Sequence, residues 1–178
     1  MKKNMEVGDP EKRRRIHAAI RKAARVARRR GVPVVPLKEA REHLQAMFDD
    51  PFERARVIAA YDSLDDVIVF NPDHGAWLDM DSYLRGHIRF FSTQNQHHLV
   101  RHELGHRAHY RLLTTDERSL LWHADLTAAQ RQLARSVSGL ATWSGKEFVA
   151  EVYAGLWAGL SYDGDVMTLF DRFRGPRP

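Results

Sequence analysis

The chain of 178 residues contains no cysteine. This absence excludes disulfide bonds, thiol nucleophiles and thiolate metal ligands, so any metal ion must be bound by histidine and carboxylate side chains. The chain also lacks the run of about 18 apolar residues that a membrane-spanning helix needs. Its first residues, Met1-Lys-Lys followed by Glu6 and Asp9, do not form the apolar core of a signal peptide. We therefore expect a cytoplasmic protein without a transmembrane segment.

The net charge of +5 is distributed unevenly along the chain. Residues 1–30 contain 12 Lys and Arg against three acidic residues, a balance of +9. The other 148 residues contain 16 Lys and Arg against 20 Asp and Glu, a balance of −4. This contrast predicts two parts: a basic amphipathic N-terminal arm over residues 1–30 and one globular domain over residues 31–178.

The apolar residues of the arm recur at helical spacing among the arginines, at Ile16, Ile20, Ala23 and Ala27. We expect a basic amphipathic helix here that ends before Gly31. Three roles are compatible with it: binding to an anionic surface or a nucleic acid backbone, docking onto an acidic protein, and solvation without a partner. No aromatic residue lies between the arginines, so base stacking is not indicated.

The body combines helical and strand patterns, which predicts a mostly helical α+β fold with a small sheet. Helices are expected over residues 36–48, 51–61, 93–113, 124–138, 145–160 and 165–173, and strands over residues 67–70 and 86–91. The second strand would lie at a sheet edge, and residues 73–81 would form a loop. Thr93 and Gln96 resemble a capping box that opens the third helix.

The third expected helix contains His102-Glu-Leu-Gly-His106. Residues four apart lie on one face of a helix, so both imidazoles can bind one zinc ion, and Glu103 can act as general base toward the attacking water. This pattern is typical of zinc peptidases. His98 lies four residues before His102 and is an alternative ligand, whereas His109 is better placed to line the cleft or to support a ligand from behind.

A catalytic zinc ion needs a third protein ligand and an open position for water. The glutamates that follow His106 are Glu117, in a polar stretch that reads as a solvated turn, and Glu147 and Glu151. The last two lie four apart in an apolar helix, where unpaired carboxylates are unfavourable. We expect one of them to bind zinc and the other to hold a ligand imidazole through its free N–H.

The motif His102-Glu-Leu-Gly-His106, followed by Glu147-Phe-Val-Ala-Glu151, resembles the gluzincin-like zinc metallopeptidase domain of the anthrax lethal factor and Pro-Pro endopeptidase type. The resemblance covers roughly residues 60–175 and implies a zincin-like fold with the metal site on the H-E-x-x-H helix. It implies that Glu147 is the third ligand and that Glu151 supports the site. The implied activity is zinc-dependent hydrolysis of peptide bonds in a peptide or protein substrate.

The resemblance also implies a substrate-binding edge strand, here with Ile88, Phe90 and Ser92, along which an extended peptide pairs. The sequence departs from the family at Leu140, where the family usually has a tyrosine that stabilises the transition state. Trp143, Tyr153, Tyr110 and His109 are the candidates to replace it. The competing hypothesis is a structural or interaction protein, for example a phage or virion component, that keeps a peptidase-like fold and uses the basic arm.

Overall fold

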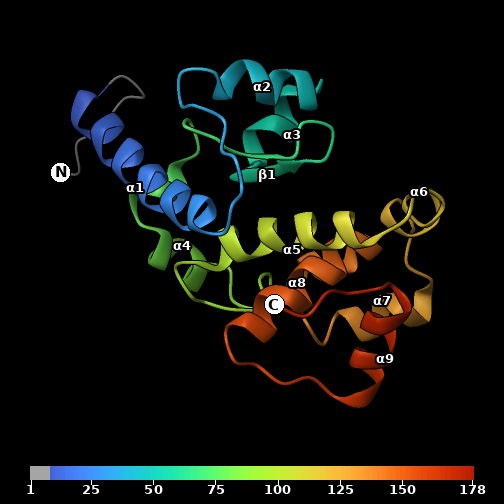
Figure 1. The fold of residues 1–178 in the computed structure, drawn as a ribbon. Coiled ribbons are helices and arrows are strands. Elements are labelled where there is room, and N and C mark those ends of the chain that lie inside the picture. Colours follow the sequence, from blue (N-terminus) through green and yellow to red (C-terminus); the bar gives the residue numbers. More distant parts are fainter. Residues whose placement is uncertain (1–8) are drawn as a thin grey trace. The chain divides into compact units, whose positions relative to one another are not determined.

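The computed structural model describes residues 9–178 and has an α+β fold, mostly helical, with one two-stranded sheet in the described residues (Figure 1). This confirms the predicted mostly helical α+β class with a small sheet. The described residues form two compact units, one of residues 9–62 and 67–80 and one of residues 63–66 and 81–178. Within residues 9–178, no helix is both long enough and apolar enough to cross a membrane.

The first unit begins with α1 (Pro10–Arg29), the helix predicted in the basic arm. Asp9 caps it by accepting a hydrogen bond from the Glu11 N–H at 2.8 Å, and the chain leaves it at Gly31, whose φ of 71° favours glycine. One face of the helix is buried; it consists of Ile16, Ile20, Ala23, Ala24 and Ala27. The amphipathic helix is thus confirmed for the described residues, while residues 1–8 of the arm lie outside them.

Two short helices, α2 (Ala40–Met47) and α3 (Pro51–Arg56), precede the sheet of β1 (Ala59–Asp62) and β2 (Val67–Phe70). The strands are antiparallel, with Ala59 opposite Phe70 and Asp62 opposite Val67. The predicted strand 67–70 is confirmed. The predicted loop 73–81 instead contains the 3₁₀ helix η1 (Gly75–Leu78) and the first residues of α4 (Met80–Gly86).

The predicted helix 51–61 is wrong in its second half, because α3 ends at Arg56 and β1 follows. The Asn71 side-chain amide donates to the carbonyl oxygens of Arg54 and Val57 at 3.2 and 2.8 Å. These bonds satisfy carbonyl groups at the end of α3. The backbone groups of the residues that follow form hydrogen bonds with β2. Pairing with the next strand along the chain, β2, therefore overrides the local helical pattern.

The second unit centres on two helices that pack side by side, α5 (His98–Leu112) and α8 (Gly145–Trp157) (Figure 1). Their backbones approach closely at Gly105, where an added Cβ would lie 3.1 Å from the Ala150 Cα atom. Around them lie α6 (Thr115–Glu117), the π-helix η2 (Arg118–Trp122), α7 (Ala128–Ala134), the 3₁₀ helix η3 (Leu140–Thr142) and α9 (Gly164–Arg172). Phe148, Val152 and Phe170 are fully buried in the core behind α8.

The predicted edge strand 86–91 is wrong. After α4 the chain turns at Arg89, with φ of 69°, and a single isolated bridge joins Ile88 and Phe91. The carbonyl oxygens of Arg89 and Phe90 accept hydrogen bonds from the N–H groups of Gly139 and Leu140, at 2.6 and 2.9 Å. The aromatic residues that suggested a strand pack in this turn, where the Phe90 and Phe91 rings meet edge to face.

The helix that carries the H-E-x-x-H motif begins at His98, not at Thr93 as predicted. The Thr93 hydroxyl accepts a hydrogen bond from the Asn95 N–H at 3.3 Å, and the Asn95 side chain accepts one from the His97 N–H at 2.8 Å. These two local turns use the capping groups before the helix starts. Because the segment before His98 is not helical, its backbone N–H groups remain available to distant side chains.

Candidate metal centre

The motif histidines lie one turn apart on α5, on the side that faces α8. His102 and His106 are both buried, and their ring centroids are 4.6 Å apart. On α8, the Ser144 hydroxyl caps the helix by accepting from the Glu147 N–H at 3.3 Å. This cap sets the start of the helix so that Glu147 and Glu151, four residues apart, both face α5.

Glu147 meets both motif histidines. Its Oε2 atom lies 3.0 Å from His102 Nε2, and its Oε1 atom lies 3.4 Å from His106 Nε2. One ligand atom from each of the three residues lies within 4.8 Å of the others. The Glu147 side chain is 18% exposed, so the group borders solvent on one side. Two imidazole nitrogens and a carboxylate thus converge at one partly accessible point.

These three side chains fit a zinc ion. Two ligands of a tetrahedral zinc ion, each at about 2.1 Å, lie about 3.4 Å apart, close to the two nitrogen–oxygen separations in the group. The N, N, O donor set is also the His₂Glu set of catalytic zinc sites that keep one open position. In the described residues, the arrangement therefore requires little movement to accept the ion.

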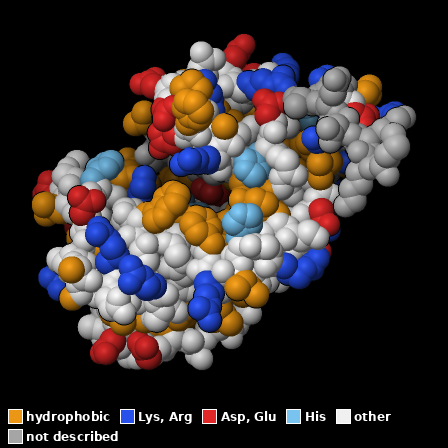
Figure 2. Space-filling view, turned by 180° about the vertical axis from the view of Figure 1, so that it is seen from behind, with side chains coloured by type: hydrophobic (Ala, Val, Ile, Leu, Met, Phe, Trp, Pro, Cys, Tyr) orange, Lys and Arg blue, Asp and Glu red, His pale blue; other side chains and the backbone are white. Residues whose placement is uncertain are grey.

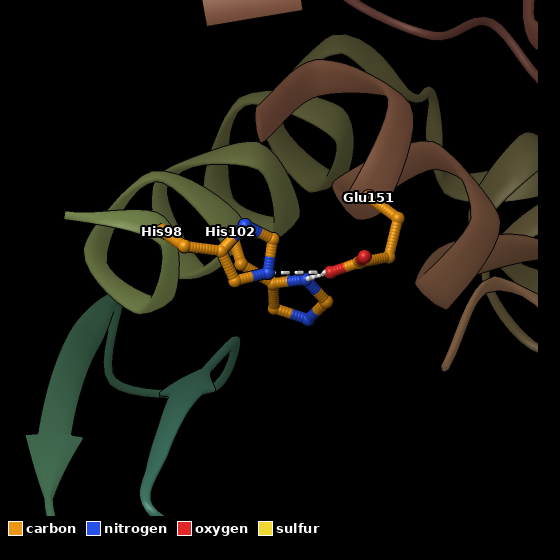
Figure 3. Close-up of side chains that lie close together, drawn as sticks. All are labelled: His98, His102 and Glu151. Carbon is orange, nitrogen blue, oxygen red and sulfur yellow. Dashed lines mark hydrogen bonds and ion pairs between the residues drawn. The ribbon is translucent and has the colours of Figure 1, made fainter. Parts of the chain in front are cut away.

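Glu151 is fully buried and lies at the Nδ1 side of the His102 ring (Figure 3), whereas Glu147 lies at its Nε2 side. Its Oε1 atom accepts hydrogen bonds from His102 Nδ1 at 2.7 Å and from His98 Nε2 at 2.9 Å. Its Oε2 atom accepts from the Ser92 N–H at 2.6 Å, and the Ser92 hydroxyl donates to the Glu151 carbonyl oxygen at 2.8 Å. The carboxylate holds the Nδ1–H of His102, which directs the Nε2 atom of the same ring toward Glu147.

The role of His98 in this network was not foreseen from the sequence. Its spacing from His102 suggested an alternative metal ligand, but the structure places its Nε2 atom on Glu151 and its Nδ1 atom 3.3 Å from the Thr93 hydroxyl. His98, His102 and Glu151 also form a group with metal-binding geometry. His98 and Glu151 are fully buried, however, and the Glu151 oxygens already accept three N–H groups, so this group offers no open position for water.

The charges of the site stabilise one another. Burial alone would lower the pKa of His102, but hydrogen bonds to Glu147 and Glu151 outweigh it and raise that pKa well above its usual value. Burial would raise the pKa of each glutamate, but the histidines that face them hold both pKa values well below the usual range. Both carboxylates are therefore ionised at neutral pH, the state in which carboxylates bind metals.

The other residues considered from the sequence have the following surroundings. Lys146, the cation closest in sequence to the two glutamates, lies over the Trp122 ring at 5.5 Å, and Glu117 closes a capping box with Thr114. Glu103 is buried on α5 directly after His102. The segment predicted as a substrate strand is a turn, in which Ile88 is 66% exposed, Phe90 contacts residue 140 through its backbone, and Ser92 binds Glu151.

The aromatic residues considered as replacements for a tyrosine at position 140 have different surroundings. The Trp143 side chain is 63% exposed, and its ring meets Phe90 edge to face. Tyr153 is buried with its ring against Trp157, and the Tyr110 ring contacts Trp122. A role of one of these side chains, or of His109, in stabilising a transition state stays a prediction.

His109 lies on the buried side of α5, against the Trp122 ring. Its Nε2 atom donates to the Phe173 carbonyl oxygen at 2.7 Å, so it supports the end of α9. Its Nδ1 atom is buried and has no hydrogen-bond partner within residues 9–178. Burial lowers the pKa of His109 to about 4, because a proton on Nδ1 would be buried unpaired, and the nearby His106 adds to this effect.

The low pKa of His109 predicts acid destabilisation. The unfolded chain takes up this proton below about pH 6.5, whereas the folded protein resists it down to about pH 4. The free energy of unfolding should therefore fall by about 2 kcal/mol from this group between pH 7 and 4.5. Urea denaturation of the metal-free protein should show a smaller decrease for His109→Gln, which keeps a donor for Phe173. Equal decreases in both proteins would contradict the assignment.

No protein-family model matches the chain, and no curated protein or solved structure matches it either. A functional conclusion for this chain therefore depends on the residues of the site and their geometry.

Proposed function

We propose that this protein is a zinc-dependent metalloendopeptidase with a zincin-like fold and its metal site on α5. The observation that carries the proposal is the convergence of His102 Nε2, His106 Nε2 and the Glu147 carboxylate, with separations of 3.0 and 3.4 Å. These three residues would hold Zn²⁺. When bound, zinc supplies Lewis acidity toward the scissile carbonyl and lowers the pKa of water toward neutrality.

The residues of the chain supply positioning and proton transfer. Glu103, adjacent to the first ligand, accepts the proton of the attacking water and passes it to the leaving amine. Glu151 keeps the proton of His102 on Nδ1, so that Nε2 presents its lone pair to the metal. The Ser92 N–H and His98 in turn hold Glu151 in place, since both donate to its carboxylate.

Removal of the His98 donor should weaken zinc binding although His98 is not a proposed ligand. In His98→Leu one of the two donors to Glu151 Oε1 is lost, and we expect zinc affinity to fall by about 3- to 10-fold. This loss is smaller than the 10- to 100-fold loss that is typical when a residue hydrogen-bonded directly to a metal ligand is replaced. His98→Gln, which keeps an N–H donor, should recover most of the affinity. Competition with a chromophoric chelator measures both values; an unchanged affinity in His98→Leu would contradict this role.

The proposed function is tested by metal analysis together with cleavage of a peptide library. We expect about one zinc ion per chain and cleavage that stops with a chelator and returns with zinc. Less than a tenth of an equivalent of zinc after reconstitution, together with no cleavage, would overturn the proposal. Full zinc occupancy without cleavage would favour the structural or interaction protein, to which Leu140 in place of the family tyrosine already points.

A further inference from the structure

The outward face of α1 is basic along its whole length. It carries seven exposed cations: Arg14, Arg15, Arg21, Lys22, Arg25, Arg28 and Arg29. The acidic residue within this helix is Glu11, which pairs with Arg14 at 2.8 Å. Figure 2 shows where Lys and Arg, acidic and hydrophobic side chains lie on one face of the protein. The large excess of cations on α1 indicates an anionic partner.

The cations fall into two rows on this face. At 100° per residue, Arg21, Arg25 and Arg28 lie on one side of the outward direction, and Lys22 and Arg29 lie on the other. Residues seven apart, such as Lys22 and Arg29, are about 10.5 Å apart along the axis. The two rows therefore flank a strip whose centre is occupied by the small side chain of Ala18.

The opposite, apolar face of α1 is buried by packing within the protein. Ile16, Ile20 and Ala27 are 5%, 2% and 0% exposed, and the helix packs in its own unit against η1. An amphipathic helix that lies in a lipid surface inserts its apolar face among the acyl chains. Because the apolar face of α1 is buried in the protein, the helix cannot insert this face into a lipid surface. Only its basic face is exposed to a partner.

The composition of the basic face fits a phosphate partner. Six of the seven cations are arginines, whose planar guanidinium groups bind phosphate through two parallel hydrogen bonds. The helix contains no Phe, Tyr or Trp that would stack on bases, and no Asn or Gln that would bind adenine. A helix about 10–12 Å in diameter also fits the major groove of B-DNA, about 12 Å wide, with a row of cations toward each backbone.

We propose that α1 binds the phosphate backbone of double-stranded DNA without reading its sequence. The proposal is independent of the peptidase function, because it depends on residues of the first unit alone. It predicts a preference among nucleic acids. Duplex RNA should bind more weakly, since its deep, narrow major groove does not admit a helix. Single-stranded DNA should also bind more weakly, since the helix has no Phe, Tyr or Trp ring to stack on its bases.

The test is fluorescence anisotropy of the full chain with two labelled 20-base-pair DNA duplexes of unrelated sequence. We expect affinities that agree within about twofold between the two sequences. If about five cations contact phosphates, the slope of log affinity against log salt is about −4.5, so that affinity falls about 500-fold from 50 to 200 mM salt. A slope near zero, or stronger binding to poly-glutamate, duplex RNA or anionic vesicles than to duplex DNA, would overturn the proposal.

Matched triple variants locate the contact. Arg21→Ala/Arg25→Ala/Arg28→Ala removes one row while alanine preserves the helix, and it should make the salt slope shallower by about 2.7. The control Arg111→Ala/Arg135→Ala/Arg172→Ala removes the same charge from exposed positions of the second unit and should leave the slope unchanged. Circular dichroism confirms that both variants fold. Equal slopes in the two variants would show that net charge, not α1, determines binding.

Discussion

Glu103→Gln is expected to lower peptide cleavage by about 10²- to 10⁴-fold while zinc stays at one equivalent per chain, because the amide cannot accept the proton of the attacking water. The substitution keeps the size of a side chain that is buried on α5, so the fold and the three ligand residues should be retained. Steady-state cleavage of a fluorogenic peptide measures the rate, and elemental analysis measures the zinc.

Glu117→Gln is the matched control for this variant. Glu117 closes the capping box at Thr114, a role that glutamine also fills, and it was the remaining glutamate downstream of the motif. The control should keep both full zinc content and full cleavage. If Glu103→Gln cleaved peptides as fast as the native protein, the general base would have to be another group and the proposed mechanism would be wrong.

Glu147→Gln should lose zinc affinity by more than about 100-fold, the second large effect that the site geometry predicts. Its carboxylate lies between His102 Nε2 and His106 Nε2, and the neutral amide removes the negative charge that offsets the cation. Glu151→Gln should cost about 10- to 100-fold, as expected for a group that holds a ligand from behind. Chelator competition gives both affinities on one scale.

The order of these two effects separates the alternatives that the sequence left open. If Glu151 were the ligand and Glu147 the supporting group, Glu151→Gln would be the more severe change. Thermal unfolding of the metal-free proteins provides the control for stability, since Glu151 is fully buried and accepts three N–H groups. A larger loss of zinc affinity in Glu151→Gln at equal metal-free stability would contradict the assignment of Glu147.

Local patterns predicted the elements that local interactions determine. Residues 10–29, 145–157 and 164–172 are helices with capping side chains at Asp9, Ser144 and Asp163, and each was recognisable by its spacing of apolar residues. Two of the errors fall where another segment supplies the backbone partners. Residues 59–62 pair with 67–70, and residues 89–90 bind 139–140. The helical spacing of residues 51–61 concealed the first contact, and the second joins segments about 50 residues apart.

The same distinction holds for the site. The i, i+4 spacings of His102 with His106 and of Glu147 with Glu151 placed each pair on one helical face, as the structure has them. The contacts of His98 and Ser92 with Glu151 span 53 and 59 residues. They depend on the late start of α5 at His98, which the apparent capping box at Thr93 concealed.

The most direct measurement of the central claim is anomalous diffraction at the zinc edge from crystals of the zinc-reconstituted protein. The account predicts one strong peak at about 2.0–2.2 Å from His102 Nε2, His106 Nε2 and a Glu147 oxygen, with Glu151 still bound to His102 Nδ1. A peak between His98, His102 and Glu151, or no peak at either group at full zinc saturation, would contradict it.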